Sequence, residues 1–169
     1  MTAGSGAAET YHPWTTYVAA REEARRRGDR RVGTDHLALG LLHDPEIASA
    51  LGITLESARE VLDSLDRQAL QAIGIAPTLD APLLPERELP SKPNVKAVLK
   101  DRLALTPAAK SALQEAGKSM RRGKHIVPQE VLVVVLGCES PDPAADLFSA
   151  LGVDAAAARL RLAKPLGSS

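Results

Sequence analysis

The tetrapeptide Ser49-Ala50-Leu51-Gly52 recurs unchanged as Ser149-Ala150-Leu151-Gly152. Each copy is followed at matching distances by a β-branched residue and an arginine: Ile53 and Arg59 in the first, Val153 and Arg159 in the second. Self-similarity of this kind within one chain indicates a repeated structural unit. The sequence therefore predicts two copies of one fold.

The similarity continues upstream of the two tetrapeptides. The aligned pieces are Val32-Gly33-Thr34-Asp35 with Ile126-Val127-Pro128-Gln129, residues 37–42 with 131–136, and Pro13 with Pro107. The second copy also carries a short insertion, residues 138–143, whose two prolines are typical of a loop.

Helical signals follow one another through the first copy. Residues 14–27 are predicted to form a helix that ends at Gly28, and Glu22 and Glu23 precede Arg26 and Arg27 by the four residues that favour ion pairs. Thr34 is predicted to be the N-cap of the next helix, with Asp35 placed favourably against the helix dipole.

The rest of the first copy is predicted to hold two more helices. A short one covers about residues 46–51 and stops at Gly52, and a longer one begins near Thr54. The longer helix carries one apolar face at helical spacing, formed by Leu55, Ala58, Leu62, Leu65, Ala69 and Ala72.

Residues 131–136 of the second copy give conflicting signals. Val131-Leu132-Val133-Val134-Val135-Leu136 has the β-branched composition of a buried strand. Its register against residues 37–42 predicts a buried helix instead. We favour the helix, because tertiary context commonly overrides weak β propensity and no partner strand is evident.

A proline-rich connection, from about residue 74 to 93, separates the two copies and is predicted to be extended and exposed. A further short helix is predicted over residues 94–103. The resulting division is a first repeat over 14–73, a linker over 74–105 and a second repeat over 106–163, with both repeats in one compact domain. The predicted fold class is all-α, with four helices in each repeat.

Composition argues against several classes of function. The formal net charge is zero, so no overall field attracts the chain to nucleic acid or a membrane surface. Cys138 is the only cysteine, which excludes an internal disulfide. The N-terminal residues do not resemble a signal peptide, and no apolar run reaches the ~20 residues of a membrane span. We expect a cytoplasmic protein.

Three other patterns in the sequence contain residue types that are found in chemical sites. Gly117-Lys118-Ser119 resembles the end of a phosphate-binding loop, but Ala112 stands where that motif requires glycine, so no nucleotide cofactor is expected. The basic cluster of residues 25–31 is interleaved with acids and is better explained as a solvated helix end. The four histidines lack metal-ligand spacing, and no nucleophile signature is present. The sequence predicts a protein that is not an enzyme and has no cofactor or metal.

The first copy resembles the Clp N-terminal repeat found at the front of ClpA, ClpB and ClpC-type unfoldases. The matching residues are Glu22-Glu23-Ala24-Arg25, Gly28, Val32-Gly33-Thr34-Asp35-His36-Leu37, Leu39-Gly40-Leu41 and Ala50-Leu51-Gly52-Ile53. The corresponding ClpC-type pattern reads E-E-A-R, G-H-N-Y-I-G-T-E-H-I-L-L-G-L and L-G-I. In the second copy, residues 105–110 resemble the family's F-T-P-R-A-K opening. The resemblance spans about residues 14–163.

This resemblance implies an eight-helix, pseudo-twofold domain that captures substrates and adaptor proteins without catalysis. In ClpC-type domains the acid of G-T-E-H holds the guanidinium of phosphoarginine on marked substrates, a role that falls to Asp35, with Thr34 at the helix start. A helix N-terminus beside an acid suits such a group. The same two residues also fit a helix cap without a ligand. Pro128 and Gln129 replace the Thr-Glu pair in the second copy.

The family's ClpC-type domains also bind cyclic peptides near the F-T-P-R-A-K opening. Leu105 replaces the phenylalanine of that opening, whereas Thr106 and Lys110 match it. The hypothesis is a Clp-associated module that binds substrates, adaptors or peptides, as adaptor or decoy. The alternative is a structural accessory subunit that docks on a Clp protease or unfoldase and binds no degradation signal. The expected partners are Clp components and substrate proteins or peptides.

Overall fold

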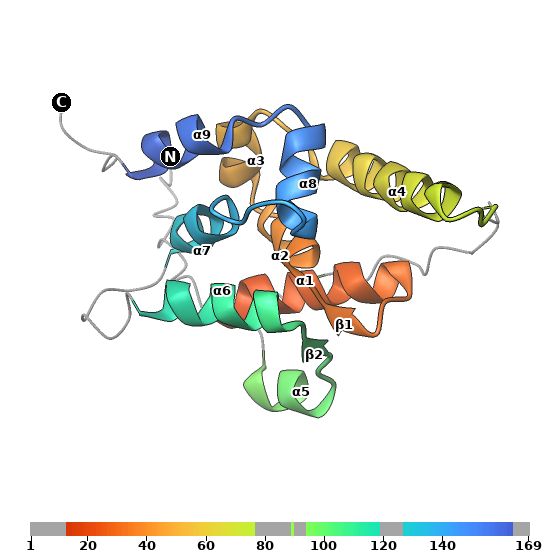
Figure 1. Ribbon diagram of the computed structural model, residues 1–169. Helices are drawn as coiled ribbons and strands as arrows, with labels where there is room; N and C mark the ends of the chain where they lie inside the picture. Colours follow the sequence, from red (N-terminus) through yellow and green to blue (C-terminus); the bar gives the residue numbers. More distant parts are fainter. Residues whose placement is uncertain (1–12, 77–88, 90–93, 119–126, 164–169) are drawn as a thin grey trace, which may run out of the picture.

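The computed structural model describes residues 13–76, 89, 94–118 and 127–163 (Figure 1). Within them the first repeat contains α1 (Pro13–Arg27), β1 (Arg31–Val32), α2 (Thr34–Leu41), α3 (Pro45–Leu51) and α4 (Leu55–Ala72). The connection contributes α5 (Val95–Lys100) and β2 (Ala104–Leu105). The second repeat contains α6 (Pro107–Gly117), α7 (Pro128–Val135), α8 (Pro143–Ala150) and α9 (Ala155–Ala163).

The all-α prediction is confirmed, including the segment with conflicting signals. Residues 131–135 belong to α7, and Val131, Leu132 and Val135 are buried, so the register of the repeat was the better guide than β propensity. The short helix of the connection is also present as α5, with the Asn94 side chain accepting hydrogen bonds from the amides of Lys96 and Ala97. Most of the proline-rich connection lies outside the described residues.

Both copies of the repeated tetrapeptide end a helix in the same way. Gly52 follows α3 with φ 69°, and Gly152 follows α8 with φ 72°. Glycine has no Cβ to oppose this left-handed conformation, so it reverses the chain at low cost. The next amide then returns to the helix: Ile53 N–H donates to Ala48 O, and Val153 N–H donates to Phe148 O. The repeated sequence thus encodes a repeated helix end.

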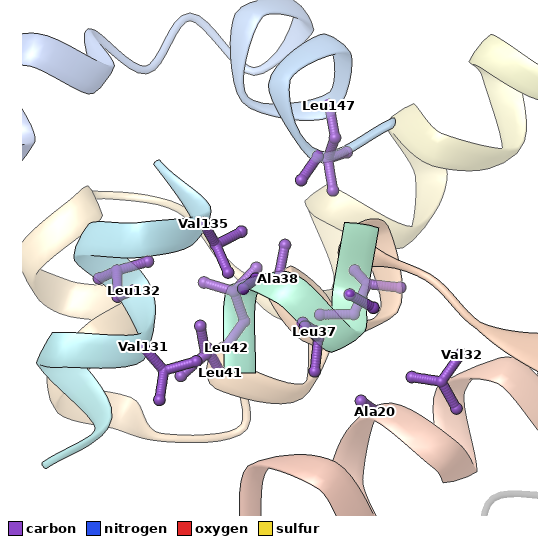
Figure 2. Close-up of a cluster of buried hydrophobic side chains, with 14 of the residues drawn as sticks. Ala20, Val32, Leu37, Ala38, Leu41, Leu42, Val131, Leu132, Val135 and Leu147 are labelled. Atoms are coloured by element: carbon purple, nitrogen blue, oxygen red, sulfur yellow. The ribbon is translucent and has the colours of Figure 1, made fainter. Parts of the chain in front are cut away.

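Helix α2 lies at the centre of the molecule and contacts α1, α4, α6, α7 and α8 (Figure 1). Figure 2 shows side chains of both repeats meeting around it, with Leu41 and Leu42 near Val131 and Val135 of α7. Leu41 is 2% exposed, as predicted. At Gly40 an added Cβ would lie 2.7 Å from the Ala20 amide nitrogen, so glycine allows α1 and α2 to pack closely. One core therefore spans both repeats.

The ion pairs predicted along α1 form differently. Glu23 does not pair with Arg27 along the helix but turns inward, to Arg59 of α4 and to His43 after α2. Arg27 pairs instead with Asp63 and Asp66 of α4. For Glu23 and Arg27, partners on other segments replace the local ones, because buried charges require close, hydrogen-bonded counterparts. Glu22 pairs within α1, but with Arg21 and Arg25.

A two-residue parallel ladder, which the sequence did not predict, links the first repeat to the end of the connection, just before α6. Arg31 pairs with Ala104 and Val32 with Leu105. Thr106 N–H then donates to Val32 O at 2.9 Å. Because α2 begins just after β1 and α6 just after β2, this ladder brings the N-termini of both helices to the same place.

Candidate functional site

A pocket of about 660 Å³ opens where the ladder joins the two repeats. The starts of α2, α6 and α8 all line it, so three helix N-termini face one space. Its lining residues are Arg27, Asp29, Arg30, Arg31, Gly33, Thr34, Asp35, His36, Asp66, Thr106, Pro107, Ala108 and Pro143. We call this space the first-repeat pocket. It brings together three residues singled out from sequence: Thr34, Asp35 and Thr106.

The turn into α2 is built by Gly33 and His36. Gly33, not Thr34 as predicted, is the N-cap, and its N–H donates to His36 Nδ1 at 2.9 Å. An amide can only donate, so Nδ1 accepts and the ring proton resides on Nε2, which donates to Asp29 Oδ2 at 3.0 Å. This hydrogen bond lowers the pKa of Asp29. His36 therefore fixes the backbone that carries Asp35.

Asp35 lies over Gly33 at the mouth of α2. A Cβ on Gly33 would lie 2.3 Å from Asp35 Oδ1, so the carboxylate occupies the space that only glycine leaves free. The Asp35 side chain is 14% exposed, and no described residue donates a hydrogen bond to its carboxylate. Its acceptor capacity thus remains open to the pocket.

Thr34 is used differently from the prediction. It is buried, and its hydroxyl donates to Asp142 Oδ1 at 2.8 Å. The same oxygen accepts the amide of Ala144 and so caps α8. The Thr34 hydroxyl therefore has no proton left for a ligand, and the donor that Thr34 can offer is its backbone amide. Sequence reasoning missed Asp142, although its place just before Pro143 at a helix start is a typical capping signal.

Cationic side chains complete the wall of the pocket. Arg27 is held by Asp29, Asp63 and Asp66; burial lowers its pKa, but these carboxylates outweigh burial and raise it. Arg30 and Arg31 are exposed and form no ion pair with any described residue. In the described part of the chain no side chain caps the first-turn amides of α2. The pocket thus combines one open carboxylate with several open donors.

The remaining predicted residues do not line this pocket. Leu105 is half-buried in the β1–β2 ladder, against the core. Lys110 is exposed one turn into α6, whose N-cap is Thr106. Gln129 is half-buried in the first turn of α7, in the other repeat.

Comparison with known proteins places this arrangement in a family. The family described as the Clp repeat (R) N-terminal domain matches residues 10–149. The chain belongs to this family. Its fold is also similar to the crystal structure of the N-terminal domain of the caseinolytic protease associated chaperone ClpD from Arabidopsis thaliana, with a TM-score of 0.62 and 19% identity. That similarity covers 91% of this chain and 95% of the ClpD domain. Family membership indicates a Clp-associated protein-interaction module.

This Clp N-terminal domain has a second, smaller pocket of about 260 Å³. The starts of α7 and α1 and the N-cap of α3 contribute to it through Pro128, Thr15 and Asp44. In the repeat alignment these positions correspond to the starts of α2, α6 and α8. We call it the second-repeat pocket, because α7 lines it in the way that α2 lines the first-repeat pocket.

The first repeat of this Clp N-terminal domain also contains a buried ionic cluster. Glu23 is 2% exposed and accepts hydrogen bonds from Arg59 Nη2 at 2.6 Å, Arg59 Nε at 3.1 Å and His43 Nε2 at 2.7 Å. Burial alone raises the pKa of Glu23, but the hydrogen bonds and charges of His43 and Arg59 lower it to about 2. The cluster therefore joins α1 to α4 through hydrogen-bonded ion pairs.

Other chemistry has little support in the described residues of the Clp N-terminal domain. No group of three or more His, Cys, Asp or Glu within them is placed to hold a metal ion. None of their helices is long and apolar enough to cross a membrane. Burial and the nearby Asp142 raise the pKa of the Cys138 thiol, which disfavours the reactive thiolate.

Proposed function

We propose that this chain is a non-catalytic binding module of Clp proteolysis that holds marked clients, adaptors or peptides, as adaptor or decoy. We further propose that the first-repeat pocket binds a phosphorylated arginine of the client. The observation that carries this proposal is the carboxylate of Asp35, which accepts no hydrogen bond from a described residue, beside two arginines that form no ion pair with one, in the same pocket.

The guanidinium and the phosphate of phosphoarginine require partners of opposite charge. Its guanidinium needs a negatively charged acceptor, which Asp35 supplies without breaking an existing hydrogen bond. Its phosphate needs donors, which Arg30, Arg31 and the first-turn amides of α2 supply from the same wall. Charge-assisted hydrogen bonds of this kind are roughly twice as strong as neutral ones.

Cyclic peptide ligands are proposed for the neighbouring surface of α6. Thr106 belongs both to this surface and to the first-repeat pocket, and Lys110 is exposed one turn further along α6. Leu105 precedes Thr106 in β2, where it pairs with Val32 of β1. A peptide that occupies this surface would therefore compete with a ligand of the pocket.

Calorimetric titration with free phosphoarginine tests the site. We expect a stoichiometry near one per chain and at least about a tenfold loss of affinity in Asp35→Asn, which keeps the shape of the side chain and removes its charge. Gln129→Ala is the matched control in the second repeat and should change little. Arginine without phosphate should bind much more weakly, because it engages only the carboxylate.

Two results would contradict the proposal. Two equivalent sites per chain would show that Gln129 can replace the acid, and affinity indifferent to Asp35 would place the ligand elsewhere. Capture of Clp subunits by a protein that does not bind phosphoarginine would favour the accessory-subunit alternative.

A further inference from the structure

We propose that His36 controls the first-repeat pocket by its protonation: neutral His36 leaves Asp35 open to a cationic ligand, and protonated His36 occupies it. This inference rests on the proposed function, because it concerns the regulation of the same site. His36 is a positioning residue here and does not itself contact the ligand.

The neutral state follows from three distances. His36 Nδ1 lies 2.9 Å from the Gly33 nitrogen and 3.3 Å from Asp35 Oδ1, and Nε2 lies 3.0 Å from Asp29 Oδ2. Since Nδ1 accepts the Gly33 proton, its lone pair and the Asp35 oxygen are two acceptors side by side. No hydrogen bond can form between them, and Asp35 keeps its full capacity to accept one from a ligand.

Protonation of His36 reverses both contacts. Nδ1 then carries a proton, so it faces the Gly33 N–H as a second donor and the Gly33 hydrogen bond is lost. Because Nδ1 has a single in-plane position for a proton, the ring or the turn must shift away from the Gly33 N–H, and the nearest acceptor for the new proton is then the carboxylate of Asp35, 3.3 Å away. A charge-assisted hydrogen bond forms there and uses the acceptor that a guanidinium requires. Ligand and proton therefore compete for Asp35.

Some of the surrounding charges favour protonation of His36 and others oppose it. Asp29 and Asp35 face the imidazole directly, and Asp66 lines the same pocket; their negative charges favour protonation. Arg27, paired with Asp29, and Arg30 and Arg31 on the pocket wall oppose it. From α6 and α8 the pocket receives Thr106, Pro107, Ala108 and Pro143, none of which titrates, and Asp142 is bonded to Thr34.

The coupling should be measurable without any ligand. We would follow the His36 ring signals and the Gly33 amide signal by NMR from about pH 8 to pH 5, the range in which histidine commonly titrates. Both should change together. In Asp35→Asn the His36 signals should change at a lower pH, because the carboxylate no longer stabilises the imidazolium. Asp44→Asn, at the N-cap of α3, is the control and should leave them unchanged.

A second measurement links the proton to binding. Phosphoarginine affinity should fall several-fold from pH 8 to pH 6 in the wild type, because the proton and the ligand compete for one acceptor. In His36→Asn the amide oxygen replaces Nδ1 as acceptor for Gly33 and cannot be protonated in this range, so the fall should be much smaller. The ligand's own phosphate titrates equally against both proteins, so their difference reports His36.

The outcomes separate the two proposals. If the His36 signals change at the same pH in wild type and Asp35→Asn, the inference is overturned, whether or not phosphoarginine binds. If His36→Asn keeps the pH dependence of the wild type, it is overturned as well. If the NMR coupling is present and no phosphoarginine binds at any pH, the proposed ligand is wrong and the proton-coupled pair stands.

Discussion

The two repeats present the same helix start with different chemistry. Gly33-Thr34-Asp35-His36 opens α2, and Val127-Pro128-Gln129-Glu130 occupies the corresponding positions at α7. Proline has no amide proton to give a phosphate, and glutamine has no charge to give a guanidinium. In the second repeat, moreover, Glu130 replaces His36, and its buried Oε2 has no hydrogen-bond partner among the described residues. The two repeats therefore share a scaffold but present different groups at this helix start.

The buried ionic cluster is also present in the first repeat and incomplete in the second. Arg59 has its counterpart in Arg159, but Gly117 stands at the position of Glu23 and Gly137 at that of His43. A Cβ on Gly137 would lie 3.5 Å from Arg159 Cζ, so the arginine still packs across the corresponding turn. Arg159 is exposed and is paired with no described carboxylate. The second repeat therefore adopts the same fold without this cluster.

The largest expected effect comes from breaking the cluster on one side only. Arg59→Ala leaves the buried carboxylate of Glu23 with only His43, and should lower the free energy of unfolding by about 3–5 kcal/mol. The matched change Arg159→Ala removes an exposed side chain and should cost less than about 0.5 kcal/mol. Urea unfolding followed by circular dichroism measures both. Equal losses would show that Arg159 has an equivalent role.

Shortening a buried side chain at the same position of α2 and of α7 compares the cores of the two repeats. Leu41→Ala should cost about 2–5 kcal/mol, because the side chain is buried and its removal leaves a cavity. Val135→Ala, at the corresponding position of α7, removes one methylene fewer and should cost about 0.8 kcal/mol less before cavity effects. Chemical denaturation of the two variants measures both losses in the free energy of unfolding. A Leu41→Ala variant as stable as the wild type would contradict the central place of α2 in the core.

Acid should destabilise the first repeat through Glu23. Its pKa falls from 4.5 to about 2 in the folded protein, so the group binds fewer protons in the folded than in the unfolded state. Its contribution, about 3 kcal/mol, is complete above pH 4.5 and is lost as pH falls toward 2. Unfolding measured between these limits should show the loss in the wild type. This loss of stability should be much smaller in Glu23→Gln, because glutamine has no carboxylate to protonate at that position.

The smallest effect is expected at Lys118. The residue lies just after α6, is exposed and pairs with Glu115, so it has the surroundings of a solvated helix end. Lys118→Ala should change the free energy of unfolding by less than about 0.5 kcal/mol. We also expect no saturable ATP binding in either protein. ATP binding that Lys118→Ala abolishes would restore the phosphate-loop interpretation; Ser119 of that pattern lies outside the described residues.

The candidate site was predictable only in part. Thr34, Asp35 and Thr106 were identified from the resemblance, and the structure brings them to one pocket. The hydroxyl of Thr34 was assigned to the wrong partner, because Asp142 lies 108 residues away in the chain. The sequence could not show either that Arg30 and Arg31 form no ion pair with the described residues, since only packing decides which residues of the basic cluster lie near carboxylates.

The sequence by itself determined the repeat, the helical class and the ends of many helices. Those features depend on local causes: glycine at Gly52 and Gly152 accepts the left-handed turn, and Thr54 caps α4 through its own side chain. The tertiary structure alone decided that Glu23 turns inward and that β1 pairs with β2. It also decided that three helix starts share one pocket. Such contacts join residues far apart in the chain, and their energies exist only once the core has formed around α2.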